Sequence, residues 1–278
     1  MNAPLVHLDV DGPIATVTLD SPANRNALSN RLVGELHAHL ETALRAEIRA
    51  VVLTGTGPVF CSGADLSEAT AGAGGGGPDF ATVLELLWEF PKTVVAKLNG
   101  HVRAGGLGLV AAADIVVAPT TASFAFAEVR IGVAPAMIAV LCARRMTARA
   151  VGRFLLTGER FDARTAVEAG LVTIVTEPEE LDVRTDELVH EIRGTEPNAV
   201  AATKRLLREL ATLDVAAGLR HAEQVSKALF ASPEAAEGIA AFKEKRPPAW
   251  QRCWRGAPQA RRGRAARGAR RHVQALAG

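Results

Sequence analysis

Two glycine-rich segments contain the residues whose types and spacing point to chemistry. Residues 60–66 (FCSGADL) have Ala64 near their centre, and residues 99–108 (NGHVRAGGLG) have Gly105 near theirs. Small residues let a backbone approach a ligand closely, and amides at the start of a helix point outward without a partner. Two such segments can each direct one N–H at a single oxygen. That arrangement is an oxyanion hole for a carbonyl that gains negative charge.

The elements that must position these segments follow an α/β pattern. Residues 50–54, 94–98 and 115–118 are short, almost entirely apolar runs, which is typical of strands covered on both faces. Leucines recur at every fourth position from Leu32 to Leu44 behind Ser29, which predicts an amphipathic helix with a serine N-cap. Residues 6–10 and 14–19 alternate around a turn and predict a β-hairpin. Strands alternating with helices predict an α/β core with several parallel strands.

The second half of the chain is predicted to be mainly helical. Asp162 is a suitable cap for a helix that ends at Gly170, and residues 171–175 follow as a strand. From about Leu181 onward the pattern is helical, including residues 199–213. Residues 71–78 are rich in glycine, but no Lys-Ser/Thr pair follows them, so they predict a mobile loop rather than a phosphate loop.

Composition excludes several classes of protein. The 278 residues are 48% hydrophobic and 22% charged, as in a folded soluble chain. Residues 247–278 hold eight arginines and no Lys, Asp or Glu, so the other 246 residues carry 24 basic and 30 acidic side chains. This basic tail is predicted to be a solvated, disordered extension. It lacks the interleaved aromatics of a single-strand nucleic-acid binder, so a nucleic-acid partner is disfavoured.

The sequence also carries expectations about the cellular location of the protein, its cysteines and metal binding. The chain begins without a leader pattern, and its longest apolar stretch, residues 131–143, is too short for a membrane span, so a cytoplasmic protein with no membrane partner is expected. The three cysteines are widely spaced and predict reduced structural thiols. The seven histidines are scattered, so no metal site is predicted.

Five motifs in order resemble the enoyl-CoA hydratase/isomerase family, also called the crotonase superfamily, over roughly residues 5 to 250. The motifs are residues 24–28, 60–66, 99–106, 127–133 and 241–246. The resemblance implies a crotonase-like ββα spiral core over residues 1–190, followed by a helical trimerisation segment over residues 191–250 and the basic tail over 251–278. It also implies a homotrimer or a dimer of trimers.

The resemblance further implies a site for an acyl-CoA thioester, which is the substrate, so no separate cofactor is expected. The amides of Ala64 and Gly105 are similar to the two donors that hold the thioester oxygen. Phe242 and Lys245 would complete the CoA site from a neighbouring subunit, with the lysine as a point charge near a phosphate. The remaining CoA contacts implied by the match are Arg25, Ala27, Ser62, Ala64, Asp65 and Leu66.

Glu128 is similar to a catalytic acid/base of the family. A carboxyl group in a mostly apolar pocket has a pKa shifted toward neutrality, which suits proton transfer at carbons near a thioester carbonyl. From the residues alone, a surface ion pair with Arg130 or Arg103 is the alternative. His101 is expected to be structural.

Gly108 stands where typical hydratases carry a second glutamate. Three explanations for this difference are open. Glu128 both activates the water and delivers the proton in hydration, Glu128 alone moves a proton between two carbons in an isomerase, or another acid reaches the site. The candidates for that other acid are Asp79, Glu85 and Glu89.

Gly108 combined with Glu128 is similar to methylglutaconyl-CoA hydratase-like members. This favours hydration of a 2-enoyl-CoA, in fatty acid or branched-chain amino acid breakdown. A catalytically weak scaffold that binds CoA thioesters is the alternative from a different class.

Overall fold

The structure is a computed structural model that describes residues 3–45, 47–69 and 78–252. Residues 71–77 of the predicted loop at 71–78, and nearly all of the predicted basic tail, lie outside the described residues. The predicted division into a core, a helical segment and a tail stays a prediction.

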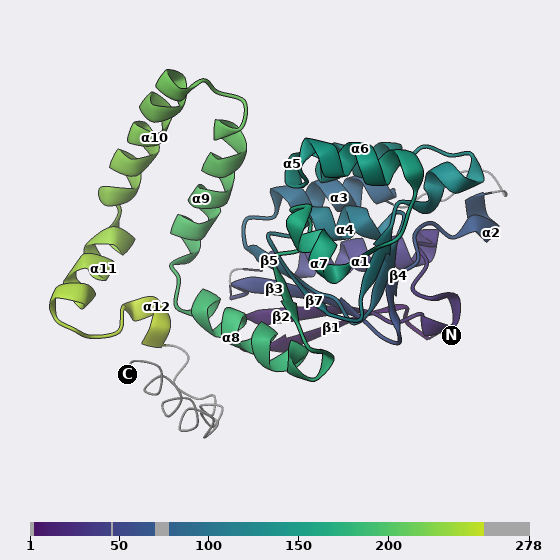
Figure 1. The fold of residues 1–278 in the computed structure, drawn as a ribbon. Helices are drawn as coiled ribbons and strands as arrows, with labels where there is room; N and C mark the ends of the chain where they lie inside the picture. Colours follow the sequence, from purple (N-terminus) through teal and green to yellow (C-terminus); the bar gives the residue numbers. More distant parts are fainter. Residues whose placement is uncertain (1–2, 46, 70–77, 253–278) are drawn as a thin grey trace, which may run out of the picture.

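A six-stranded sheet forms the base of the fold, in the order β1-β2-β3-β5-β7-β10 (Figure 1). Its first two strands form the predicted antiparallel hairpin, with Asp11 opposite Ile14, and every later neighbour in the sheet is parallel. The strands are β1 (Val6–Asp11), β2 (Ile14–Leu19), β3 (Ala50–Gly55), β5 (Thr93–Lys97), β7 (Ile115–Pro119) and β10 (Ile174–Thr176).

Both faces of this sheet are covered, as its apolar strands predict. Val51 and Leu53 of β3 belong to the larger hydrophobic cluster, whereas Ala50 and Val52 belong to a smaller cluster on the opposite face. Helix α8 (Leu181–Arg193) supplies the partner residues of the smaller cluster: Leu181, Val189 and Ile192. Successive side chains of a strand point to opposite faces, so an uninterrupted apolar run is what two covered faces require.

Helices that follow the strands cover the larger cluster. The first of them begins behind Ser29, whose hydroxyl accepts from the Leu32 N–H at 3.2 Å, as predicted. Leu32, Leu36 and Leu40 of this helix are fully buried. The helices of this layer are α1 (Asn30–Thr42), α3 (Phe80–Glu89), α4 (Gly106–Ala112) and α5 (Ala136–Arg145), with the short α2 (Leu66–Ala69) beside them.

A second, four-stranded sheet, which the sequence did not predict, runs in the order β4-β6-β8-β9. Its strands have only two or three residues, too few for a period of two to show. It is backed by stacked rings, with Phe154 and Phe161 4.0 Å apart between centroids. The strands are β4 (Val59–Cys61), β6 (His101–Arg103), β8 (Ser123–Ala125) and β9 (Phe161–Asp162), and helices α6 (Ala148–Thr157) and α7 (Ala163–Glu168) flank β9 in the chain.

The strand predicted at residues 171–175 is wrong in its first half. Asp162 caps α7 by accepting from the Thr165 N–H, as expected. The amides of Leu171 and Val172 then bond back to the Ala166 carbonyl, so they close the end of α7, and β10 starts only at Ile174. The predicted helical character after residue 181 is confirmed.

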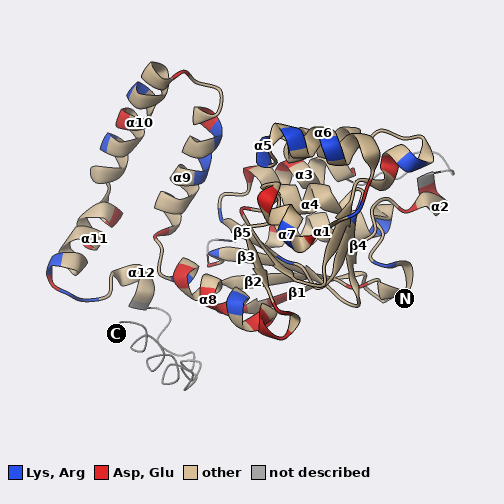
Figure 2. Ribbon diagram, viewed as in Figure 1, with Lys and Arg blue, Asp and Glu red and all other residues tan. Residues whose placement is uncertain are grey.

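The last helices extend away from the sheets (Figure 1). They are α9 (Pro197–Leu210), α10 (Val215–Phe230), α11 (Pro233–Lys243) and α12 (Ala249–Arg252). Charges of both signs are mixed along α8, α9 and α10 (Figure 2), and several large apolar side chains of α10 and α11 are exposed, among them Phe230 and Phe242. None of the described helices has the length and hydropathy that crossing a membrane requires.

Candidate active site

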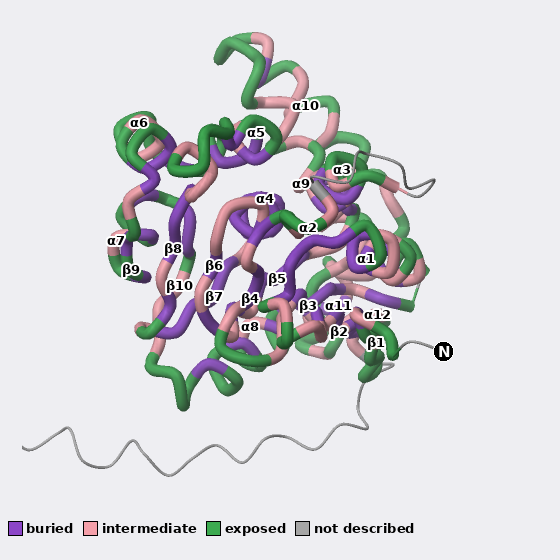
Figure 3. Tube along the Cα trace, turned by 90° about the vertical axis from the view of Figure 1, so that its right-hand side faces the viewer, coloured by how far each residue is buried: buried purple, intermediate pink, exposed green. Residues whose placement is uncertain are grey.

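Three neighbouring strands of the second sheet lead into the three predicted catalytic positions. Strands β4, β6 and β8 are parallel neighbours (Figure 3). Ala64 follows the end of β4 by three residues, Gly105 follows β6 by two, and Glu128 follows β8 by three. Parallel strands end at the same edge of a sheet, so the sheet brings together groups that are 64 residues apart in the chain.

The two glycine-rich segments are in direct contact. A Cβ on Gly63 would lie 2.6 Å from the Ala104 Cβ and 3.2 Å from the Gly105 nitrogen. Gly63 has φ +93°, a backbone conformation that other residues rarely adopt. A side chain at position 63 would therefore force the segments apart.

The amides of Ala64 and Gly105 are unused within the described part of the chain, where neither donates to a protein acceptor. The adjacent amides are bonded: Asp65 donates to the Leu28 carbonyl at 3.4 Å and Ala104 donates to the Ala125 carbonyl at 3.0 Å. Ala104 has φ +46°, a conformation that costs energy for a residue with a Cβ. Each unused amide thus has a bonded neighbour that limits its direction, as an oxyanion hole requires.

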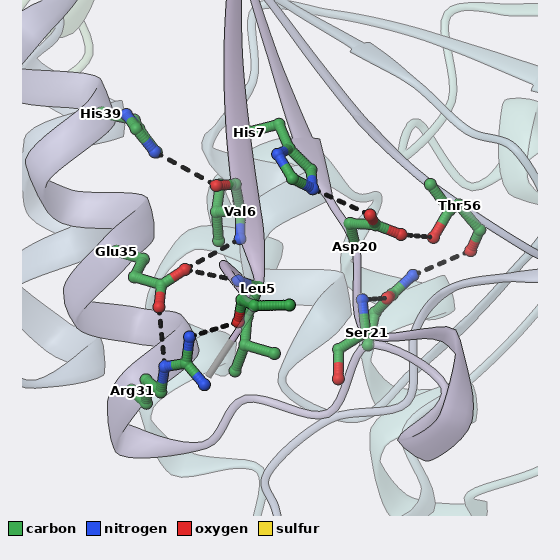
Figure 4. Close-up of polar contacts among 11 residues, drawn as sticks. Leu5, Val6, His7, Asp20, Ser21, Arg31, Glu35, His39 and Thr56 are labelled. Carbon is green, nitrogen blue, oxygen red and sulfur yellow. Dashed lines mark hydrogen bonds and ion pairs between the residues drawn. The ribbon is translucent and has the colours of Figure 1, made fainter. Parts of the chain in front are cut away.

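Asn26 fixes the segment that passes beside Ala64. It is fully buried with φ +55°, its Oδ1 accepts from the Ser21 N–H at 2.7 Å, and its Nδ2 donates to the carbonyls of Thr56 and Val59 at 3.1 and 2.9 Å. Figure 4 shows Ser21 and Thr56 at this junction, where Thr56 also donates to Asp20. Sequence reasoning placed Asn26 in a motif without giving it this role.

The predicted CoA contacts of the first two motifs form one surface. The Ser62 N–H donates to the Arg25 carbonyl at 3.1 Å, and the Ala27 N–H donates to the Asn24 Oδ1 at 3.3 Å. Asp65 accepts from the backbone and hydroxyl of Ser67, which lowers the pKa of its carboxyl group. The Arg25 and Leu66 side chains are exposed beside them.

The structure does not bring Phe242 or Lys245 to this surface within one chain. Phe242 is 85% exposed on α11, which lies at the opposite end of the molecule from α2 and β4 (Figure 1). Lys245 follows α11 with φ +53°. Their predicted role in a neighbouring subunit's site stays a prediction.

Glu128 lies in a short 3-10 helix (η2, Ala127–Ile131) and its side chain is partly buried. Its Oε2 is inaccessible to solvent and has no hydrogen-bond partner among the described residues. Burial raises the pKa of this carboxyl group because the charged form loses its hydration. The alternative ion pairs are absent: Arg103 donates to Ser123, and the Arg130 Nε donates to the Gly158 carbonyl.

Cys142 contacts the first turn of α4 and lies near Glu128. Its Sγ lies 3.8 Å from the Leu107 carbonyl oxygen. Burial, and secondarily the negative charge of Glu128 nearby, raise the pKa of this thiol to about 12. The carboxyl group therefore lies near the helix whose N-cap is Gly105.

The position of the missing second glutamate is filled by aliphatic side chains. A Cβ on Gly108 would lie 2.6 Å from the Ile138 Cγ2 and 3.2 Å from the Leu84 Cδ2. The three acids that could replace this glutamate either make other interactions or are exposed to solvent. Asp79 caps α3 through the Thr82 N–H, Glu89 pairs with Arg208 at 2.8 Å, and Glu85 is exposed.

Together these groups supply two unused N–H donors and one partly buried carboxyl group. Such a site can hold an oxygen that gains negative charge while a single group moves a proton beside it. Cys61 and Cys142 are free and buried, as the sequence predicts.

Comparisons with known proteins show which family this chain resembles. A model of the enoyl-CoA hydratase/isomerase family matches residues 9–253. A carnitinyl-CoA dehydratase of Salmonella enteritidis is 35% identical over 258 residues, covering 88% of this chain and 98% of that protein.

Two solved structures have the same fold. An enoyl-CoA hydratase/isomerase from Marinobacter aquaeolei superposes with a TM-score of 0.83 at 32% identity, over 90% of this chain and all of that one. An enoyl-CoA hydratase of Mycobacterium smegmatis superposes with a TM-score of 0.82 at 31% identity, over 89% and 99% of the two chains.

Proposed function

Because the chain belongs to the enoyl-CoA hydratase/isomerase family, we propose that it adds water to a 2-enoyl-CoA thioester to give a 3-hydroxyacyl-CoA. The observation that carries this proposal is the partly buried carboxyl group of Glu128, whose Oε2 lacks a partner within the described chain. A carboxyl group that has one unpartnered oxygen, and whose pKa is raised by burial, is suited to exchange a proton with a substrate.

In the proposed mechanism, the amides of Ala64 and Gly105 hold the thioester oxygen. The Glu128 carboxylate takes a proton from a water molecule as the water oxygen forms its bond to C3. The electron pair of the C2–C3 double bond moves onto the thioester as an enolate, which the two amides stabilise. Glu128 then returns the proton to C2, so one carboxyl group completes the addition. An amide donor of this kind contributes roughly 10²- to 10³-fold in rate.

A second candidate is an isomerase that moves a double bond from C3–C4 to C2–C3. The observation that favours it is the packing at Gly108, where Ile138 and Leu84 fill the space of a second carboxyl group. This reaction needs only one base, because Glu128 removes a proton from C2 and delivers it to C4 of the same enolate.

In either reaction the CoA part of the substrate binds to the surface that contains Arg25, Ser62 and Asp65. We propose that Phe242 and Lys245 complete this surface from a neighbouring subunit in a homotrimer or a dimer of trimers. Exposed apolar side chains on α10 and α11 support such an assembly. The similarity at residues 108 and 128 makes methylglutaconyl-CoA the first branched substrate to test.

The deciding experiment follows the absorbance of the conjugated enoyl thioester. Purified protein is mixed with crotonyl-CoA, with methylglutaconyl-CoA and, separately, with a 3-enoyl-CoA. Loss of absorbance from the first two supports hydration, and a gain from the third alone supports the isomerase. Binding of all three thioesters without any change supports the scaffold and overturns both enzymatic proposals.

A further inference from the structure

A cavity lies beside the segments that lead to Ala104 and Glu128. Its volume is about 410 Å³, and it is lined by three arginines and three small residues: Arg103, Arg130, Arg160, Ala125, Ala127 and Gly158. This volume is within the range of small-molecule sites, roughly 300 to 1,000 Å³. No acidic side chain is among the lining residues.

Among the described residues, only neutral groups hold Arg103 in place. It is partly buried, and it donates to the Val102 carbonyl at 2.8 Å and to both the carbonyl and the hydroxyl of Ser123. Its neighbour His101 shares the same hydroxyl, with the Nδ1 3.1 Å from the Ser123 Oγ. These contacts orient the guanidinium without neutralising its charge.

The other two arginines keep donors free for a ligand. Arg130 uses its Nε on the Gly158 carbonyl at 2.8 Å, which leaves its two terminal nitrogens without a partner among the described residues. Arg160 is exposed, and the described residues offer it neither a hydrogen bond nor an ion pair. The nearest sequence neighbour with a carboxyl group, Glu159, pairs with Arg153 instead.

Gly158 shapes the approach of Arg130. A Cβ at this position would lie 3.1 Å from both the Cγ and the Nε of Arg130, and the residue has φ +62°. A glycine here therefore lets the arginine lie against the backbone. Ala125 and Ala127 similarly keep the space between the three guanidiniums open.

Three positive charges around one cavity repel one another. Burial, and next the charge of Arg160, lower the pKa of the Arg103 guanidinium, and burial followed by Arg103 and Arg160 lowers that of His101. A dianion in the cavity would leave a net charge near +1, whereas a monocarboxylate would leave +2. Guanidinium groups bind phosphate oxygens in bidentate geometry, so a phosphate group suits both the charge and the donors.

We propose that Arg103, Arg130 and Arg160 form a binding site for a phosphate group, either free phosphate or the monoester of a small molecule. This proposal does not rest on the proposed function. Two of the site's lining residues lie next to the candidate catalytic segments in the chain, because Arg103 precedes Ala104 and Ala127 precedes Glu128.

The test measures the affinity of the full chain for inorganic phosphate and for glycerol 3-phosphate by calorimetry, with succinate as a dicarboxylate comparison. Arg160→Gln is the main variant, because Arg160 makes no hydrogen bond that the fold needs among the described residues. Arg164→Gln, an exposed arginine on α7 outside the cavity, is the matched control. All titrations are repeated with acetyl-CoA at saturation, so that phosphate binding at the CoA surface is blocked.

We expect phosphate to bind in the presence of acetyl-CoA, Arg160→Gln to weaken binding about tenfold or more, and Arg164→Gln to leave it unchanged. Tighter binding of glycerol 3-phosphate than of phosphate would identify a monoester, and equal binding would identify free phosphate. Stronger binding of succinate, displacement by acetyl-CoA, or no difference between the two variants would overturn the proposal.

Discussion

Replacing Glu128 with glutamine tests the central group of the site. The amide keeps the shape of the side chain but removes its charge and its ability to carry a proton. Ala64 and Gly105 are untouched, so acyl-CoA binding is expected to persist. A positioned acid/base contributes about 10²- to 10⁴-fold, so kcat should fall by that factor while KM changes little.

The same variant should be more stable than the wild type, in a pH-dependent way. Burial raises the pKa of Glu128 above its ordinary value of 4.5, so the folded state holds this proton more tightly than the unfolded state does. The unfolding free energy of the wild type therefore falls as pH rises from about 4.5 through the folded-state pKa. The glutamine side chain does not titrate, so the variant lacks this loss.

The size of the gain follows from the environment of the carboxyl group. One oxygen is buried and without a partner in the described chain, and an unpartnered charged group costs about 1 to 3 kcal/mol or more, whereas the neutral amide at the same place costs less. Glu128 is only partly buried, so the lower end, about 1 kcal/mol, is expected above the folded-state pKa. For a chain of this size that corresponds to roughly 2 to 4 °C in melting temperature.

The assay pairs steady-state kinetics with urea unfolding of both proteins across the pH range. Glu85→Gln, an exposed carboxyl group on α3, is the control and should alter neither measurement. Normal turnover by the Glu128 variant would refute its assignment as the acid/base. A stability difference that does not vary with pH would refute the argument from burial.

Three further substitutions test the surrounding packing. Gly108→Ala places a methyl group 2.6 Å from Ile138 and should lower the unfolding free energy by about 1 to 3 kcal/mol in urea melts. Gly63→Ala forces the two amide segments apart, and loss of one donor predicts a fall in kcat of about 10²- to 10³-fold in the same absorbance assay. Asn26→Ala removes the hydrogen bonds of two partly buried carbonyls and one N–H, so melts should show a loss of about 1 to 3 kcal/mol, and CoA titrations should show a weaker affinity.

The longer elements could be predicted from the sequence because their patterns exceed one period. The apolar run of β3 predicted a strand with two covered faces, and Ser29 with its following leucines predicted α1. The family and its α/β fold were likewise predicted from five ordered motifs, and the comparisons confirm both.

The second sheet could not be predicted, because β4, β6 and β8 have three residues each and β9 has two. Its existence depends on pairings between strands about 20 to 40 residues apart, which no local period reports. The environment of Glu128 could not be predicted from the sequence for the same reason. Whether that side chain pairs with Arg103 or buries an oxygen without a partner depends on where β6 and β8 place both residues.

The spacing of this second sheet fits the roles that we propose for Ala64, Gly105 and Glu128. Neighbouring strands lie about 4.8 Å apart, so groups that follow adjacent strands are offset by roughly that distance. Ala64 and Gly105 follow adjacent strands, which suits two donors meeting at one oxygen. Glu128 follows the next strand, one step beyond Gly105, which favours contact with carbons adjacent to the carbonyl over contact with its oxygen. A base at that offset can protonate or deprotonate an enolate without competing with the amides for the oxygen.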